Sequence, residues 1–297
     1  MSTRQLNRGL RTLLAASVLA AVLGSVHAFS VFLAPLESAF GASRASVSLT
    51  YSIALVTLTA AVLFGHRIYA RWRAGVFLLL ISLLAAGGAL VAAFAPSLIV
   101  VWIGYGVLFG GANGLGYGFG LQIAAQANEG REGLAMGIVT AAYALGAAVS
   151  PPMFAEALQW GGYQTAMIGL CAALIVLGGV GASTLSASGF RFREQPSQAS
   201  ATLPGRGALA LLWIGYGAGV AGGLMAIGHA AGIVRSVSAA GADWVAPVVI
   251  AVCNMVGSLI AGRLADRISP VWVLTGLPFL SGVALCVLAS SGETAVI

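Results

Sequence analysis

The amino-acid sequence predicts an all-α integral membrane protein, on three observations. Of the 297 residues, 59% are hydrophobic and only 7% are charged. A water-soluble domain carries about 25% charged residues, so a soluble chain of this composition would lack the polar side chains that cover a surface. The apolar residues also form long runs, whereas an outer-membrane barrel shows short segments of alternating polarity.

Composition excludes several other classes of protein. Disordered chains are poor in hydrophobic residues and rich in charge, and a secreted disulfide scaffold needs many cysteines, whereas this chain has three, all inside apolar runs. The net charge of +6 is spread over loops and forms no groove-reading element, so no nucleic-acid partner is expected. We expect no cofactor and no metal site, and the expected partners are the lipid bilayer and a small organic anion.

Nine apolar runs have the length of about 20 residues that a membrane-spanning helix needs. The runs are, in chain order, Leu13–Pro35, Val47–Gly65, Gly75–Ala95, Leu98–Gln122, Gly133–Phe154, Thr165–Leu185, Ala208–His229, Trp244–Leu264 and Val271–Ser290. The first run is too long for the apolar core of a signal peptide, and eight more runs follow it. We therefore interpret it as a retained helix.

The arginines predict the orientation, because cytosolic loops are enriched in basic residues. All 14 basic residues are arginine. With a cytosolic N-terminus, twelve fall on the cytosolic side: Arg4, Arg8, Arg11, Arg67, Arg71, Arg73, Arg131, Arg191, Arg193, Arg206, Arg263 and Arg267. Only Arg44 and Arg235 fall outside. This distribution of arginines predicts a cytosolic N-terminus. The high alanine and glycine content suggests a GC-rich bacterium, so we expect a protein of the bacterial inner membrane.

A polar segment divides the chain. Residues 187–206 are rich in serine, glutamine, proline and charge, as expected of a solvated linker. We predict a six-helix bundle over residues 1–186, a cytosolic linker over 187–206 and a partial second bundle of three helices over 207–297. Since the chain stops in what reads as another apolar run, we expect it to be incomplete at its C-terminus, and monomeric if full length.

The most specific motif is Gly262-Arg263-Leu264-Ala265-Asp266-Arg267, after the eighth run. It resembles the loop signature of the major facilitator superfamily, whose transporters have two six-helix halves. Gly262 permits close approach of helices, Asp266 can accept hydrogen bonds from helix N-termini, and Arg267 adds a cytosolic charge. We expect these residues to form a conformational latch. The corresponding loop after the second run keeps Arg71 but has Ala70 in place of the acid.

The fifth run carries a glycine and proline signature that resembles the antiporter signature of the same superfamily. Gly137 and Gly146 are followed by Ser150-Pro151, where glycines permit tight contact and Pro151 can kink the helix. Generic glycine packing between membrane helices is the alternative interpretation. An alternative function, the efflux of amphipathic compounds, is supported by this signature alone.

Two stretches narrow the resemblance. They are residues 24–36 with 40–48, and Arg131-Glu132-Gly133-Leu134-Ala135-Met136-Gly137. They are similar to the oxalate/formate antiporter family and to monocarboxylate porters. The resemblance implies a secondary carrier of small carboxylates that works by alternating access. In the oxalate carriers a cation in the eighth helix helps to bind the dianion, whereas the interior of this run, residues 245–262, has no charge.

Neutral polar residues and histidines at suitable depths are the candidates for contact with substrate, because hydroxyl and amide groups hold a carboxylate by hydrogen bonds. The candidates are His27, Ser30, Asn113, Tyr117, Thr140, Tyr143, Tyr216, His229 and Asn254. Hydrogen bonding between helices is the alternative role for each. No cluster of His, Asp and Glu has the spacing of a catalytic site, so an enzyme is not expected. Besides a carrier and an enzyme, a third hypothesis is that the chain is a fragment that does not transport by itself.

Overall fold

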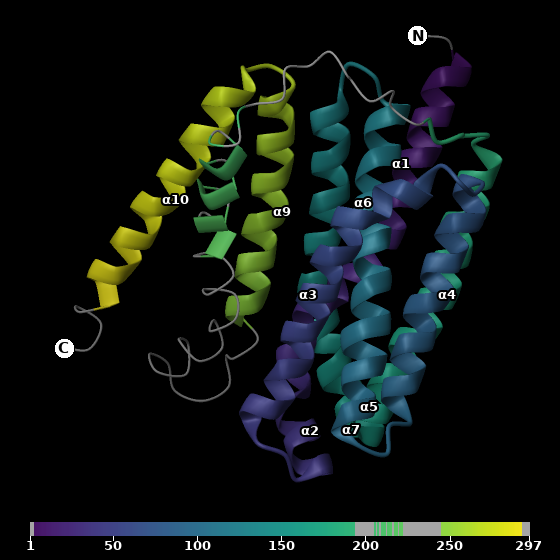
Figure 1. The fold of residues 1–297 in the computed structure, drawn as a ribbon, viewed down its shortest axis with the longest axis vertical. Coiled ribbons are helices and arrows are strands. Elements are labelled where there is room, and N and C mark those ends of the chain that lie inside the picture. The colour runs from purple at the N-terminus through teal and green to yellow at the C-terminus, as the bar shows by residue number, and fades with distance from the viewer. Residues whose placement is uncertain are drawn as a thin grey trace. The chain divides into compact units, whose positions relative to one another are not determined.

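The computed structural model describes residues 3–193 and 245–292, together with scattered residues between 205 and 221 (Figure 1). The described elements are α1 (Thr3–Leu23), η1 (Gly24–Phe32), α2 (Leu33–Phe40), α3 (Arg44–Tyr69), α4 (Ala74–Ala93), α5 (Leu98–Val101), η2 (Trp102–Phe109), α6 (Gly110–Ala127), α7 (Glu132–Ala187), α9 (Val245–Ala265) and α10 (Pro270–Gly292). No strand occurs in the described ranges, so the predicted all-α class is confirmed.

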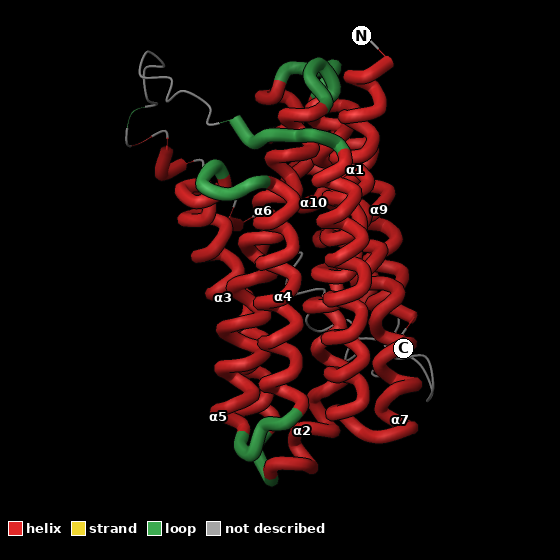
Figure 2. Tube along the Cα trace, turned by 90° about the vertical axis from the view of Figure 1, so that its right-hand side faces the viewer, coloured by secondary structure: helices red, strands yellow, loops and turns green. Residues whose placement is uncertain are grey.

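The chain divides into two compact units. Residues 1–193 and 251–266 form the first, and residues 194–250 and 267–297 form the second. In the first unit α1 and α4 pack against α7, and α3 packs against α6. Figure 2 shows that these helices run side by side, with their connecting loops at the helix ends. The boundary that we predicted at residues 187–206 remains a prediction.

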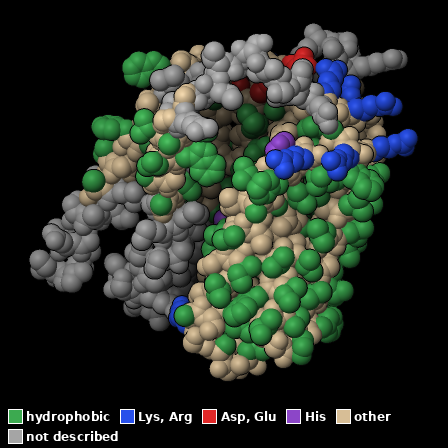
Figure 3. Space-filling model, in the orientation of Figure 1, with side chains coloured by type: hydrophobic (Ala, Val, Ile, Leu, Met, Phe, Trp, Pro, Cys, Tyr) green, Lys and Arg blue, Asp and Glu red, His purple; other side chains and the backbone are tan. Residues whose placement is uncertain are grey.

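The outer surfaces of the first unit are apolar. Val56, Phe64 and Val176 are each more than half exposed, and hydrophobic side chains cover the helix flanks while most arginines gather near the end where α1 begins (Figure 3). Such extensive apolar exposure is unstable in water but suits a lipid bilayer. Six described helical segments are long and apolar enough to cross a membrane: Asn7–Phe40, Arg44–Tyr69, Ala74–Ala93, Leu98–Ala127, Glu132–Ala187 and Val248–Ala265.

The first predicted run is a compound helix. It begins at Thr3, so the N-terminal arginines extend the helix beyond the apolar run, and it passes from α1 through the 3₁₀ segment η1 into α2. Gly41, with φ of 59°, ends α2 in the left-handed conformation that favours glycine. The side chain of Ser43 then accepts a hydrogen bond from the amide of Ser46 and caps the start of α3.

The fifth and sixth predicted runs are joined in α7, which is continuous except at Gly161 and Gly162, where the backbone is non-helical. Its 56 residues thus comprise two helices, each of membrane-crossing length. The first helix remains helical through Pro151, where we had predicted that a kink was possible. The change of direction instead occurs at the two glycines, and Gly162 adopts φ of 70°.

Glycines allow α1 and α7 to touch at backbone distance. A Cβ atom added to Gly146 would collide with the carbonyl oxygen of Ala21, and one added to Gly24 would collide with that of Tyr143. Membrane helices associate through such contacts because lipid tails supply no hydrophobic driving force between them. This contact fixes the depth of η1 relative to α7, and so it positions the side chains described next.

Candidate functional site

A group of polar side chains from four helices lies inside the first unit, which we call the polar cluster. It comprises His27, Tyr51, Asn113, Tyr117, Thr140 and Tyr143. His27 lies on η1, and its Nδ1 is 2.8 Å from the hydroxyl of Tyr51 on α3. The His27 ring also meets the Tyr143 ring edge to face, with centroids 5.5 Å apart. One histidine thereby connects α3 with α7.

The buried Asn113 organises the other half of the cluster. Its Nδ2 donates to the carbonyl oxygen of Leu23 at 2.6 Å, and its Oδ1 accepts from the hydroxyl of Tyr143 at 3.0 Å. Leu23 is the last residue of α1, where the chain changes to the 3₁₀ pattern. Asn113 therefore ties α6 to the point where α1 passes into η1. Asn113 thus supports the transition that presents His27.

Tyr117 on α6 and Thr140 on α7 complete the cluster, with hydroxyl oxygens 3.3 Å apart. The Tyr117 ring packs on the Tyr143 ring at 4.8 Å between centroids. His27, Tyr51, Tyr117 and Thr140 are all partly exposed, whereas Asn113 and Tyr143 are buried. The cluster therefore has a buried support and an accessible rim.

The rim holds hydrogen-bond donors without a formal charge. A neutral imidazole and a tyrosine hydroxyl have one proton each, and the bond between His27 and Tyr51 uses one of them. In either tautomer the pair retains one further donor, on Nε2 of His27 or on the Tyr51 hydroxyl. Ser30 lies one 3₁₀ turn after His27, on the same face, and is exposed. These groups suit an acceptor such as a carboxylate.

The remaining predicted cavity residues do not join the cluster in the described structure. Asn254 lies exposed on α9, where its Oδ1 accepts a hydrogen bond from Oγ of Ser258 at 3.3 Å. Tyr216 and His229 lie outside the described residues. Tyr51, in contrast, was missed by the sequence analysis. Its signal was available, because Thr50-Tyr51 is a polar pair within the second apolar run.

The loop motif meets the start of α7. The two carboxylate oxygens of Asp266 accept hydrogen bonds from the amides of Gly133 and Leu134, at 2.7 and 2.8 Å. These amides lie in the first turn of α7, which no side chain of its own N-cap residue Arg131 caps. Asp266 therefore supplies a helix cap from a distant part of the chain, and its negative charge lies at the positive end of the helix.

Glycines make this approach possible. An added Cβ on Gly137 would lie 2.6 Å from the carbonyl oxygen of Ser258, and one on Gly262 would collide with that of Gly133. Of the other residues predicted for the latch, Arg71 is exposed in the turn after α3, and Arg267 is exposed and belongs to the second unit. The structure thus brings together Asp266, Gly262, Gly133 and Gly137.

Comparison with known proteins places this geometry in a family. The family described as the Major Facilitator Superfamily matches residues 13–297, almost the whole chain. A search of curated proteins found no match. The family match and the apolar helices together identify an integral membrane protein that transports a small-molecule substrate.

Proposed function

Because the chain belongs to the major facilitator superfamily, we propose that it is a secondary active transporter of small organic anions, of the monocarboxylate or oxalate/formate type. In such a carrier two bundles move around a central substrate by alternating access. The proposal includes the predicted bundles 1–186 and 207–297, the linker 187–206 and a cytosolic N-terminus in a bacterial inner membrane.

The observation that carries the proposal is the polar cluster. Its rim offers hydroxyl and imidazole donors from η1, α3, α6 and α7, and a carboxylate accepts such bonds on two oxygens. Among the described residues of the cluster there is no arginine, aspartate or glutamate. Neutral donors stabilise a single negative charge more readily than two, because each buried charge needs its own compensation. A monocarboxylate is therefore the substrate we propose first, and oxalate the second.

The test uses the 297-residue chain reconstituted in lipid vesicles. Uptake of radiolabelled formate, lactate and oxalate is compared with uptake by vesicles without protein. We expect uptake of at least one monoanion, and His27→Leu and Tyr51→Phe each lower its rate about tenfold, as expected for a lost hydrogen bond to a charged group. Tyr163→Phe is the matched control, since Tyr163 packs on Phe40 away from the cluster.

Two results would contradict the proposal. One is the absence of uptake for all three anions. The other is uptake that the His27 and Tyr51 variants leave at the level of the Tyr163 control. Export of amphipathic compounds, the alternative function, is examined in the same vesicles with a lipophilic cationic dye, and active dye export without anion uptake would favour it.

A further inference from the structure

A second site lies in the first unit, apart from the polar cluster, at the ends of three membrane segments. It is a pocket of about 230 Å³ between the start of α1, the loop after α6 and the chain that follows α7. Three arginines line it, Arg8, Arg191 and Arg193, together with one acid, Glu129. We call it the arginine pocket. Its charged side chains sum to an excess of positive charge, and the polar cluster shares none of them.

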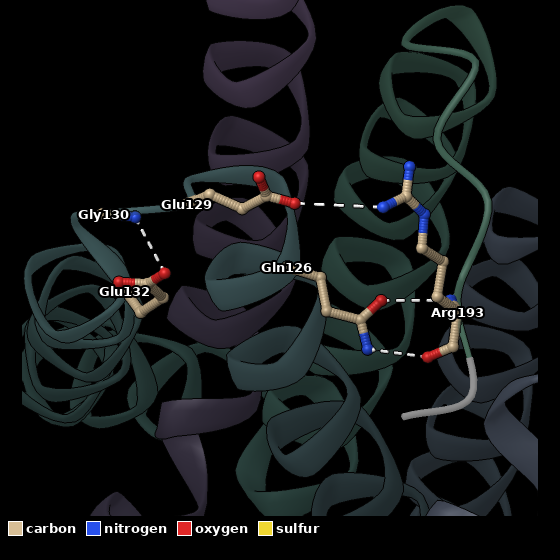
Figure 4. A network of polar contacts seen from close by, with 5 residues as sticks. All are labelled: Gln126, Glu129, Gly130, Glu132 and Arg193. Atoms are coloured by element: carbon tan, nitrogen blue, oxygen red, sulfur yellow. Dashed lines mark hydrogen bonds and ion pairs between the residues drawn. The ribbon is translucent and has the colours of Figure 1, made fainter. Parts of the chain in front are cut away.

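Several contacts build this pocket. The side chain of Gln126 donates to the backbone oxygen of Arg193 at 3.0 Å and accepts from its backbone nitrogen at 3.1 Å (Figure 4). This pair of bonds fixes the chain after α7 beside the end of α6. On the other wall, Arg8 donates to the carbonyl oxygen of Gly189 at 3.0 Å and lies over the Phe190 ring at 5.6 Å.

The arginines retain capacity for a ligand. Arg8 has five N–H donors, and its one hydrogen bond within the described residues, from one terminal nitrogen to Gly189, leaves further N–H groups of the guanidinium for a ligand. Arg191 makes no hydrogen bond or ion pair within the described part of the chain. Arg193 is 3.9 Å from Glu129, but both side chains are about 80% exposed, so this pair contributes at most about 1 kcal/mol. Glu129 therefore holds Arg193 only weakly, and the three arginines and one acid leave an excess of two positive charges.

The position of the pocket indicates its ligand. Arg8 is the second residue of the span Asn7–Phe40, and Gln126 is next to the last residue of the span Leu98–Ala127. Residues 190–193 begin three positions after the end of the span Glu132–Ala187. The ends of these spans mark the level at which hydrocarbon gives way to phospholipid headgroups. Arginine side chains bind phosphate oxygens with several N–H donors at once.

We propose that the arginine pocket binds a phosphate group, in the first place that of an anionic phospholipid in the leaflet predicted to be cytosolic. A soluble phosphate compound would offer the same chemistry, and the experiment separates the two sources. Basic pockets between membrane helices on the cytoplasmic side are a general form of site for anionic lipid headgroups. Occupancy would hold the first turns of α1, the end of α6 and the chain after α7 together.

The experiment measures phosphatidylglycerol retained by the detergent-purified 297-residue chain in native mass spectrometry, with phosphatidylcholine as the zwitterionic comparison. Inorganic phosphate is titrated separately by calorimetry. The first variant is Arg191→Gln, which removes charge without removing an intramolecular bond of the described structure. Arg73→Gln is the matched control, because it makes the same charge change at an exposed position outside the pocket. Arg8→Gln follows as the second variant.

We expect the affinity for phosphatidylglycerol to fall about fivefold in Arg191→Gln and to stay unchanged in Arg73→Gln, the size expected for one basic residue near a membrane surface. That result, with no binding of inorganic phosphate, assigns the lipid as the source. Binding of inorganic phosphate that Arg191→Gln weakens assigns a soluble phosphate compound. Equal retention by the wild-type chain and both pocket variants, or equal loss in the Arg73 control, overturns the proposal.

Discussion

The carboxylate of Asp266 caps α7 by accepting a hydrogen bond from the amide of Gly133 at 2.7 Å, across 133 residues of sequence. A second oxygen accepts from the next amide, that of Leu134. A helix that lacks a capping side chain of its own thus depends on an acid from α9 and its following turn. The contact ties two distant segments at one helix end, and the conformational latch remains a prediction.

Asp266→Asn tests this cap directly. The amide side chain has one acceptor oxygen in place of two and no charge, so the variant loses a hydrogen bond and its interaction with the helix dipole. We expect hydrogen exchange at the amides of Gly133 and Leu134 to become about fivefold faster, which corresponds to roughly 1 kcal/mol at an exposed helix end.

Glu132→Gln is the control for this experiment. Glu132 is also an acid at the start of α7, but its carboxylate accepts from the amide of Gly130 within its own loop (Figure 4). Exchange at Gly133 should be the same in this variant as in the wild-type chain. Equal acceleration in both variants would show that loss of any acid near the helix end is sufficient, and that the cap is not specific.

Gly262→Ala is expected to separate α9 from α7. The added methyl group would collide with the backbone oxygen of Gly133, and backbone atoms cannot move aside as a flexible side chain can. Gly257→Ala on the same helix meets nothing within 4 Å and serves as the matched control. The readout is again hydrogen exchange at Gly133 and Leu134, which we expect to increase only in Gly262→Ala.

Gly146→Ala is expected to destabilise the first unit. Its methyl group would collide with the carbonyl oxygen of Ala21 on α1, and overpacking of this kind costs about 1–3 kcal/mol. Gly169→Ala, also on α7, has open space around the new methyl group. The measurement is the thermal midpoint of unfolding in detergent. A midpoint for Gly146→Ala as high as that of Gly169→Ala would contradict the backbone contact.

Asn113→Leu is expected to destabilise the first unit more than Tyr143→Phe does, because Asn113 makes two buried hydrogen bonds. It removes both hydrogen bonds of Asn113, the one to the Leu23 carbonyl and the one from the Tyr143 hydroxyl, and a buried hydroxyl left without its partner costs about 1–3 kcal/mol. Tyr143→Phe removes one bond and should be milder. The two variants are compared by thermal unfolding in detergent, and a Tyr143→Phe effect equal to that of Asn113→Leu would show that the Leu23 bond contributes nothing.

Most of the helices were predictable because transfer of apolar residues from water to lipid is a local property of the chain. The predicted runs begin or end within a few residues of α3, α4, α9 and α10. The start of α1 was predicted too late, since its arginines extend the helix beyond the apolar run, and the joint between the helices of α7 lies at Gly161 and Gly162. Glycine pairs permit such a change of direction without any change in hydropathy.

The sites were less predictable than the helices. Five candidates chosen by depth, His27, Asn113, Tyr117, Thr140 and Tyr143, do lie together in the structure. Tyr51 was not among them, although it contacts His27 directly. Depth in the membrane can be counted along the sequence, but the rotation of each helix about its axis cannot be read from a span that is apolar on every side.

The sequence by itself determined that this chain is a helical membrane protein, and its loop motif was enough to indicate the superfamily that the comparison then showed. Only the tertiary structure decided that Asp266 caps the helix beginning at Glu132, that Tyr51 pairs with His27, and that Arg8 and Arg191 line one pocket. The physical reason is that hydropathy sums along the chain, residue by residue. Contacts between helices depend instead on the relative rotation and depth of several helices, and those are set by close backbone contacts such as that of Gly146 with Ala21.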